Sequence, residues 1–262
     1  VTSFPAKDFS RLMKHGRSVI IVETDKKYES TQMQATYDMY AQPQILITVT
    51  GPSDTAVMNY LENKGSALKT VINMFERDCF VKATTNKYDK ELQLLIEKKF
   101  GFNLTLPTDY RLRVDVPDFL WISNEMPLIS QGVVIYSYPY TDPNTFTTDF
   151  LNAKRDAVLS RLVSGSVEGA YMGTEYKVMP PQMRTILVQD SAQAYEIRGL
   201  WKIKNGEAMG GPYVSHTRLD HVNGRIVTAE TFLYAAGQKK RSALRQAEAI
   251  LYTLQLPEDN VK

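Results

Sequence analysis

The order of hydrophobic and polar residues switches repeatedly between a strand-like and a helix-like period, which predicts a chain of mixed strands and helices. Apolar runs predict buried strands at 18–22, 44–50 and 132–138, and the last of these should be central in its sheet. Further strands are predicted at 110–116, 119–123, 176–178, 184–189 and 195–203. The stretch 23–42 is polar with scattered tyrosine and methionine residues, and we predict it to be mostly irregular.

Helical stripes predict the remaining elements. One helix begins with Ser53 or Asp54 as its cap. Its apolar stripe consists of Val57, Leu61, Leu68, Val71, Ile72 and Phe75. A second helix covers 87–100 and ends at Gly101, a residue type that commonly follows the last helical turn. Other helices are predicted at 4–15, 148–163 and 239–254.

The segment 195–234 holds the densest mixture of aromatic, charged and glycine residues, and the rest of the chain is expected to be its scaffold. Alternation in the strand 195–203 places Trp201 on the core face, where Gly199 leaves room for another group to approach the backbone. Asn223-Gly224 lies between two β-rich runs and predicts a hairpin with a two-residue turn. Such a turn pairs Val222 with Arg225, Thr217 with Glu230, and Tyr213 with Tyr234.

Glu230 falls on the hairpin face that carries aromatic and β-branched residues. A buried carboxylate needs a partner, because without one it would protonate or destabilise the fold. Arg198 is the first candidate for this partner, and Arg241 or Arg245 from the last helix is the second. The ion pair is either structural or half of a binding site, and we favour the structural interpretation.

These elements predict an α+β fold, with one largely antiparallel sheet or two related sheets and with helices packed mainly on one face. We expect two α+β halves, 1–130 and 131–262, the second of which carries the glycine-rich loop and the hairpin. An internal similarity indicates that the halves are related. The strand 45–47 and the helix after it resemble the strand 133–135 and the helix containing Phe150 and Lys154. Chance similarity of two amphipathic elements is the alternative.

Composition argues against several classes of function. The 31 basic and 29 acidic side chains leave a net charge of +2, which gives no electrostatic footprint for nucleic acid or for an anionic membrane. Cys79 is the only cysteine in the sequence, which excludes an internal disulfide and a cysteine-based metal site. No stretch approaches the roughly 18 consecutive apolar residues of a membrane span.

Catalytic motifs are not found either. His216 and His221 lie five residues apart in a predicted strand, which places them on opposite faces and prevents them from sharing a metal. The sequence has no H-E-x-x-H and no G-x-S-x-G motif. We therefore expect no catalytic residue, no metal and no cofactor.

The loop 205–212 is rich in glycine, which permits positive φ and could aim backbone amides at a ligand. It is not a phosphate loop, because neither a Lys-Ser/Thr pair nor a helix follows it. We favour a structural turn over a ligand cradle. Arg155 and Asp156 lie together in a predicted helix, where sequence neighbours do not face each other, so each is expected to pair elsewhere. An arginine at this position could also hold a carboxylate or a phosphate.

Several short motifs resemble a known family. They are Gln42-Pro43-Gln44, Arg155-Asp156, Gly199-Leu200-Trp201, the Met-Gly-Gly-Pro run 209–212, and Lys240-Arg241. The chain resembles a family of uncharacterised Bacteroidetes cell-envelope lipoproteins that is known only as a domain of unknown function, and the resemblance covers nearly the whole chain. It implies export and a lipid anchor at the envelope, facing the periplasm or the surface, and it implies no activity. Members usually begin with a lipoprotein signal and a further strand and helix. We therefore expect the first half to lack its first strand and helix, and the lipid anchor to be absent from this chain.

Three hypotheses for the function follow. The first is a non-enzymatic exported envelope protein that binds a ligand or a protein partner. Its expected binding residues are Arg155, Arg198, Trp201, Met209, Gly210, Gly211, Glu230 and Arg241. The second is a hydrolase acting on an envelope polymer, with Glu230 as acid/base and Glu196 or Glu248 as the second carboxylate. The third is a purely structural component of an envelope complex.

Overall fold

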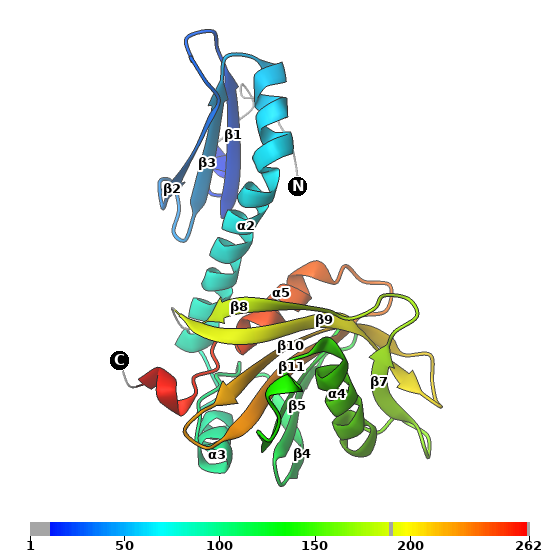
Figure 1. The fold of residues 1–262 in the computed structure, drawn as a ribbon. Helices are drawn as coiled ribbons and strands as arrows, with labels where there is room; N and C mark the ends of the chain where they lie inside the picture. The colour runs from blue at the N-terminus through cyan, green and yellow to red at the C-terminus, as the bar shows by residue number, and fades with distance from the viewer. Residues whose placement is uncertain (1–10, 189–190, 261–262) are drawn as a thin grey trace. The chain divides into compact units, whose positions relative to one another are not determined.

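The computed structural model describes residues 11–188 and 191–260 of the chain, which divides into two compact units, Val1–Cys79 and Phe80–Lys262. The boundary lies within α2 (Asp54–Asn86), a helix of 33 residues (Figure 1). The sequence placed the boundary at 130/131 instead. That position lies inside the larger unit, between two strands that pair with each other in one sheet, β5 (Phe119–Glu125) and β6 (Ser130–Pro139).

The smaller unit is a three-stranded sheet with α2 on one face. The central strand β3 (Ile45–Gly51) pairs in parallel with β1 (Ser18–Thr24) and antiparallel with β2 (Gln32–Tyr37). The predicted stripe of α2 is confirmed, because all its residues pack with Ile45, Ile47 and Val49 of β3. The prediction that 23–42 is mostly irregular is wrong for β2, which pairs with β3. Met33, Ala35 and Tyr37 alternate with polar residues in this strand, and Met33 packs on the core.

The larger unit is built on an eight-stranded sheet in which every pairing is antiparallel. The strands run in the order β4-β5-β6-β11-β10-β9-β7, and β8 also pairs with β9. The strands besides β5 and β6 are β4 (Arg111–Val116), β7 (Tyr171–Glu175), β8 (Gln182–Val188), β9 (Ala192–Lys204), β10 (Gly210–Asp220) and β11 (Arg225–Tyr234). The predicted α+β class, the antiparallel sheet and the central position of β6 are confirmed. At one edge of the sheet, the register of β4 against β5 shifts between Leu112 and Val114.

Helices cover both faces of this sheet (Figure 1). α3 (Lys90–Phe100) and α5 (Arg241–Leu251) pack on one face, against residues that include Ile122, Ile135 and Val227. α4 (Thr148–Leu162) packs on the other face, where Trp201 and Phe232 lie. Helices are thus gathered mainly on the α3 and α5 face, as predicted, and α4 forms a separate layer. The short helical turns are α1 (Arg11–Lys14), η2 (Pro143–Thr145) and η3 (Pro257–Asn260). Residues 4–10 of the helix predicted at 4–15 lie outside the described residues.

The β10–β11 hairpin forms, but its turn is longer than predicted. Asp220 pairs with Arg225, so the loop has four residues, 221–224. The Asp220 carboxylate accepts hydrogen bonds from the backbone N–H and side chain of Asn223 and from Arg225, which draws the loop around it. The register therefore moves by two residues, and Ser215 rather than Thr217 lies opposite Glu230. Because the move is an even number, every side chain stays on its predicted face.

Other predicted elements differ in place or in context. The strand expected at 176–178 lies instead at 171–175, where β7 pairs with β9. The two strand–helix units proposed as related differ in sheet topology, because β3 has a parallel neighbour whereas β6 has antiparallel neighbours on both sides. In the described residues no helix is long and apolar enough to cross a membrane.

Glycine is required where β10 crosses Trp201. Gly211 pairs with Trp201, whose ring N–H donates a hydrogen bond to the Leu233 carbonyl oxygen at 3.2 Å. A Cβ atom on Gly211 would lie 1.9 Å from that same oxygen. The loop before it, 205–209, joins β9 to β10, and Gly210 and Gly211 already belong to the strand. The preferred interpretation of this segment as a structural turn is therefore supported.

Replacing Gly211 with alanine should destabilise the larger unit by about 2 kcal/mol or more, because the new methyl group meets backbone that cannot move aside cheaply. Urea unfolding followed by tryptophan fluorescence measures this unit alone, since Trp121 and Trp201 both belong to it. The control is Gly65→Ala on α2, whose Cβ would meet nothing within 4 Å and which should leave the tryptophan transition unchanged. A Gly211→Ala midpoint equal to that of the native chain would contradict the steric argument.

Candidate functional site

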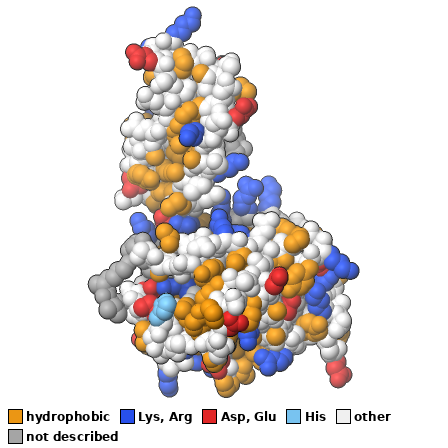
Figure 2. All heavy atoms as spheres, in the orientation of Figure 1, with side chains coloured by type: hydrophobic (Ala, Val, Ile, Leu, Met, Phe, Trp, Pro, Cys, Tyr) orange, Lys and Arg blue, Asp and Glu red, His pale blue; other side chains and the backbone are white. Residues whose placement is uncertain are grey.

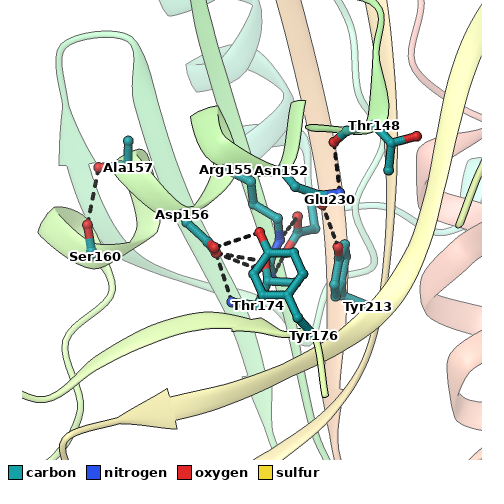
Figure 3. A network of polar contacts seen from close by, with 10 residues as sticks. All are labelled: Thr148, Asn152, Arg155, Asp156, Ala157, Ser160, Thr174, Tyr176, Tyr213 and Glu230. Atoms are coloured by element: carbon teal, nitrogen blue, oxygen red, sulfur yellow. Dashed lines mark hydrogen bonds and ion pairs between the residues drawn. The ribbon is translucent and has the colours of Figure 1, made fainter. Parts of the chain in front are cut away.

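A buried ion pair joins α4 to the middle of the sheet (Figure 3). Arg155 Nε donates to Glu230 Oε2 and Arg155 Nη2 donates to Glu230 Oε1, both at 2.7 Å. The exposed fractions are 2% for the arginine side chain and 0% for the glutamate side chain. The two parallel bonds match the fork of the guanidinium to the carboxylate, which is the strongest geometry such a pair adopts. The partner of Glu230 is therefore Arg155, and the predictions of Arg198, Arg241 or Arg245 are wrong.

The reason for this correction lies in the faces of the sheet. Arg198 is adjacent to Ile197 on β9 and points to the opposite face, where it binds Glu196. Arg241 and Arg245 belong to α5, which packs on that same opposite face. Arg155, by contrast, lies within the apolar stripe of α4 between Leu151 and Val158, and so faces the sheet at Glu230.

An aromatic ring supports the guanidinium. Gly199 lies directly opposite Tyr213, and a Cβ atom on the glycine would lie 2.6 Å from the tyrosine ring. The missing side chain lets the ring lie against β9, and the Arg155 guanidinium carbon lies 3.8 Å from the centre of that ring. Such a contact adds cation–π attraction to the ion pair. The Tyr213 hydroxyl donates to Asn152 of α4 at 3.0 Å, which fixes the orientation of the ring between β9 and α4.

Asp156 extends this network to the edge strand β7 (Figure 3). Its Oδ1 atom accepts bonds from the backbone N–H of Thr174 at 2.8 Å and from the Thr174 hydroxyl at 2.7 Å. The same hydroxyl accepts a bond from Arg155 Nη1 at 2.9 Å. The exposed Tyr176 hydroxyl donates to the second oxygen of Asp156 at 2.9 Å. Arg155 and Asp156 thus have separate main partners, as predicted. The prediction that they do not contact each other is wrong, because Arg155 Nη1 also forms an ion pair with Asp156 Oδ1 at 3.6 Å, and Thr174 links the two.

The ion pair is unsuited to acid–base catalysis. Burial raises the pKa of the Glu230 carboxyl, against the opposing charge and hydrogen bonds of Arg155. Burial lowers the pKa of Arg155, but the charge of Glu230 outweighs it and the net shift is upward. Both Glu230 oxygens are bound by Arg155 and neither is exposed, so no substrate reaches them.

A second buried carboxylate lies on the opposite face of the sheet. Glu196 accepts bonds from Arg198 at 2.7 Å and from Arg184 at 2.6 Å, and its other oxygen lies 3.3 Å from Nε2 of His216. Burial raises the pKa of Glu196, but the bonds from His216 and the two arginines outweigh this effect and hold the pKa below its ordinary range. Arg198 also binds Glu248 of α5. Glu196 and Glu248 therefore lie across the sheet from Glu230, and the carboxylate pair required by the hydrolase hypothesis does not form.

An open groove of about 350 Å³ lies beside the β9–β10 turn. Its lining includes Leu200, Trp201, Ile203, Met209, Gly210 and Gly211, and we call it the Trp201 groove. Glu175 and Lys202 form an ion pair along it. The side chain of Lys202 and the backbone N–H groups of Lys177 and Val178 hold the pKa of Glu175 at about 2. The arrangement offers an apolar surface with a fixed charged pair at its side.

The predicted site residues therefore separate into three places. Trp201, Met209, Gly210 and Gly211 are all among the residues that line the groove. Arg155 and Glu230 form the buried ion pair, and Arg198 lies on the opposite face. Arg241 is the exposed first residue of α5. Sequence reasoning missed Glu175 and Thr174, because β7 was placed too late in the chain. In the residues that the structure describes, no group of three or more His, Cys, Asp or Glu side chains could hold a metal ion.

Comparisons with known proteins give two family matches. The model described as domain of unknown function (DUF4837) matches residues 89–253, and the model described as domain of unknown function (DUF8532) matches residues 1–85. No curated protein matches the chain. Both matches are consistent with the resemblance to an uncharacterised family, and the gap between them falls at the end of α2.

The chain also aligns with solved structures at low sequence identity. The solution structure of cyanobacterial PsbP (CyanoP) from Synechocystis sp. is 12% identical and aligns over 60% of this chain and 86% of that chain, with a TM-score of 0.40. The Saccharomyces cerevisiae Ran-binding protein Mog1p is 8% identical and aligns over 60% of this chain and 92% of that chain, with a TM-score of 0.37.

Removing one partner of the buried ion pair should cost about 3–5 kcal/mol of unfolding free energy, because the other charge remains buried without compensation. We expect this loss for Arg155→Met and for Glu230→Met. The double variant should be more stable than either single variant, since it buries no charge. Urea unfolding followed by tryptophan fluorescence gives the unfolding free energies of the native chain, the two single variants and the double variant, which together form a double-mutant cycle.

The control for this cycle is Asp115→Asn, which breaks the partly exposed ion pair with Lys99 and should cost about 1 kcal/mol or less. If the losses of the two single variants simply add in the double variant, the two side chains do not act as a pair.

Glu175→Gln should reduce stability in a pH-dependent way. The folded-state pKa of Glu175 is about 2, below the ordinary value of 4.5, so its stabilising contribution is complete above about pH 4.5 and is lost as the pH falls toward 2. The stability difference between the native chain and the variant should therefore be largest at pH 6 and shrink through pH 4 and pH 3. Glu168→Gln, at an exposed position outside the groove, is the control. A difference that stays constant over this range would show that the ion pair with Lys202 does not hold the carboxylate.

Proposed function

The chain belongs to the family described as domain of unknown function (DUF4837), and we propose that it is a non-enzymatic binding protein of the cell envelope whose Trp201 groove receives apolar side chains of a protein partner. The observation that carries this proposal is an open groove whose lining is mostly apolar and includes Leu200, Ile203 and Met209. Grooves of this size that are lined mostly by apolar side chains, with few polar groups, are typical of binding sites.

The loop between β7 and β8 supports a protein partner over a small enclosed ligand. Val178 lines the groove and its exposed fraction is 76%, and Tyr176 and Met179 beside it are also exposed. Aromatic residues and methionine are enriched where proteins contact one another. Together with the groove, these side chains form an apolar surface that is open to solvent and that a partner segment could cover.

The charged pair beside the groove would orient such a partner. Lys202 keeps part of its side chain exposed while it binds Glu175. A charged rim around an apolar centre contributes more to specificity and to the rate of association than to affinity. Figure 2 shows basic and acidic side chains interspersed on the displayed face, with hydrophobic side chains between them. This distribution suits a protein partner better than nucleic acid, for which a basic stripe would be expected.

The proposal assigns the Arg155–Glu230 pair a structural role. The pair fixes α4 on the sheet, and Asp156 of α4 in turn binds Thr174 of β7. It therefore positions β7, whose Glu175 lines the groove, without contacting the partner itself. An envelope location is supported by the sequence resemblance to envelope lipoproteins.

The groove can be tested with a capped hexapeptide that has a central Leu-Phe pair. In a ¹⁵N-NMR titration we expect saturable shifts of the Gly210 and Gly211 amide signals, and none from the same peptide with a central Ser-Ser pair. Val178→Lys should weaken binding about tenfold or more, because it places a charge in the apolar surface. The matched control is Val222→Lys, whose side chain is 64% exposed in the β10–β11 turn, and it should leave binding unchanged.

Equal weakening by both variants, or shifts confined to other parts of the chain, would overturn the assignment of this groove. The absence of any saturable shift would overturn it as well.

A further inference from the structure

A larger cavity, of about 540 Å³, lies elsewhere in the larger unit. It shares no residue with the Trp201 groove or with the Arg155–Glu230 pair. Its polar lining comprises Thr84 and Lys87 near the end of α2, Thr108, Asp109 and Tyr110 before β4, Gln131 of β6 and Gln246 of α5. Phe80, Ala83 and Pro107 supply apolar wall. This size lies within the range of pockets that enclose small ligands.

The floor of the cavity is a buried amide with spare hydrogen-bonding capacity. The Gln131 side chain is 5% exposed, its Oε1 atom accepts a bond from the Tyr110 hydroxyl at 2.9 Å, and its Nε2 atom donates to the Ala243 carbonyl at 3.0 Å. These two bonds fix the orientation of the amide. A primary amide has two N–H donors and an oxygen with two lone pairs, so one donor and one acceptor remain for a ligand.

The cavity also carries one charge of each sign. Lys87 contributes an ammonium group from an exposed position, and Asp109 contributes a carboxylate. Asn124 lies opposite Gln131 in the sheet and donates to Asp109 Oδ2, which fixes the carboxylate at the same end of the sheet as the amide. A fixed carboxylate favours a ligand cation, and an ammonium on a flexible stem favours a ligand anion.

We infer that this cavity binds a small zwitterion, an amino acid or short peptide, whose ammonium group meets Asp109 and whose carboxylate meets Lys87. The Gln131 amide pairs with a peptide group or with the polar backbone between the two charges. A neutral sugar would leave both charges of the cavity without a counter-charge. A simple anion or cation would satisfy only one of them.

Isothermal titration calorimetry of the full chain with L-alanine, L-Ala-L-Ala and L-Ala-L-Ala-L-Ala tests this inference. At least one of these zwitterions should bind. Acetylating its amino group or amidating its carboxyl group should each weaken binding about tenfold or more, because each removes one charge-assisted hydrogen bond. Sucrose is the neutral comparison and should not bind.

Two variants assign the charges to their partners. Asp109→Asn should weaken binding of the free peptide and leave the affinity of the acetylated peptide unchanged. Lys87→Met should weaken binding of the free peptide and leave the affinity of the amidated peptide unchanged. The matched controls are Lys90→Met and Glu91→Gln, exposed on α3 outside the cavity, and both should bind like the native chain.

The crossed pattern separates a charge-specific site from a loss of folding, which would weaken all ligands alike. The variants are accepted for comparison only if their tryptophan-detected unfolding midpoints stay near the native value. The inference is overturned if none of the three zwitterions gives saturable heat, if the capped peptides bind as tightly as the free ones, or if sucrose binds equally well.

Discussion

The two parallel hydrogen bonds between Arg155 and Glu230 fix α4 on the sheet, and much of the larger unit is arranged so that they can form. Gly199 has no side chain, so Tyr213 can lie against β9, and the tyrosine ring then supports the guanidinium. Asp156 uses the next position of the helix to hold β7 through Thr174. Because a buried charge is tolerated only with a partner in good geometry, these contacts select one position of the helix among those that hydrophobic packing alone would allow.

The opposite face of the sheet also holds a buried carboxylate that is compensated by arginine, but with different residues. Glu196 is buried under α5 as Glu230 is buried under α4, and arginines from β8 and β9 compensate its charge. The two carboxylates thus belong to separate layers and serve packing. The two proposed binding sites lie elsewhere. The Trp201 groove leaves apolar surface open to solvent, and the cavity at Gln131 is lined mostly by polar side chains.

Much of the fold could be predicted from the sequence, because strand and helix periods act locally. The stripe of α2, the end of α3 at Gly101 and the core face of Trp201 all follow from residue spacing. The partner of Glu230 did not follow, since it depends on which helix covers which face. One signal was present: Arg155 interrupts the apolar stripe of α4, and a charged residue in that position must find a buried partner. The prediction of the β10–β11 register was wrong for a local reason. The Asp220 carboxylate binds Asn223 and Arg225 and so favours a four-residue loop over the two-residue Asn-Gly turn. The cavity at Gln131 joins four distant segments, and no local pattern brings them together.

The shift of register in β4 bears on how the protein behaves when it is crowded. A flat, unpaired edge strand is a template for a strand of another chain, and the backbone groups of β4 lie at such an edge. The register shift between Leu112 and Val114 breaks the regular spacing of those groups. Arg113, which lies in the shift, binds Ser123, and Asp115 after it binds Lys99, so both charged side chains are already held within the chain. An incoming strand would have to pair with an irregular backbone and displace these contacts. The β4 edge of the sheet is therefore protected against edge-to-edge aggregation, and that protection resides in a strand that takes no part in either proposed site.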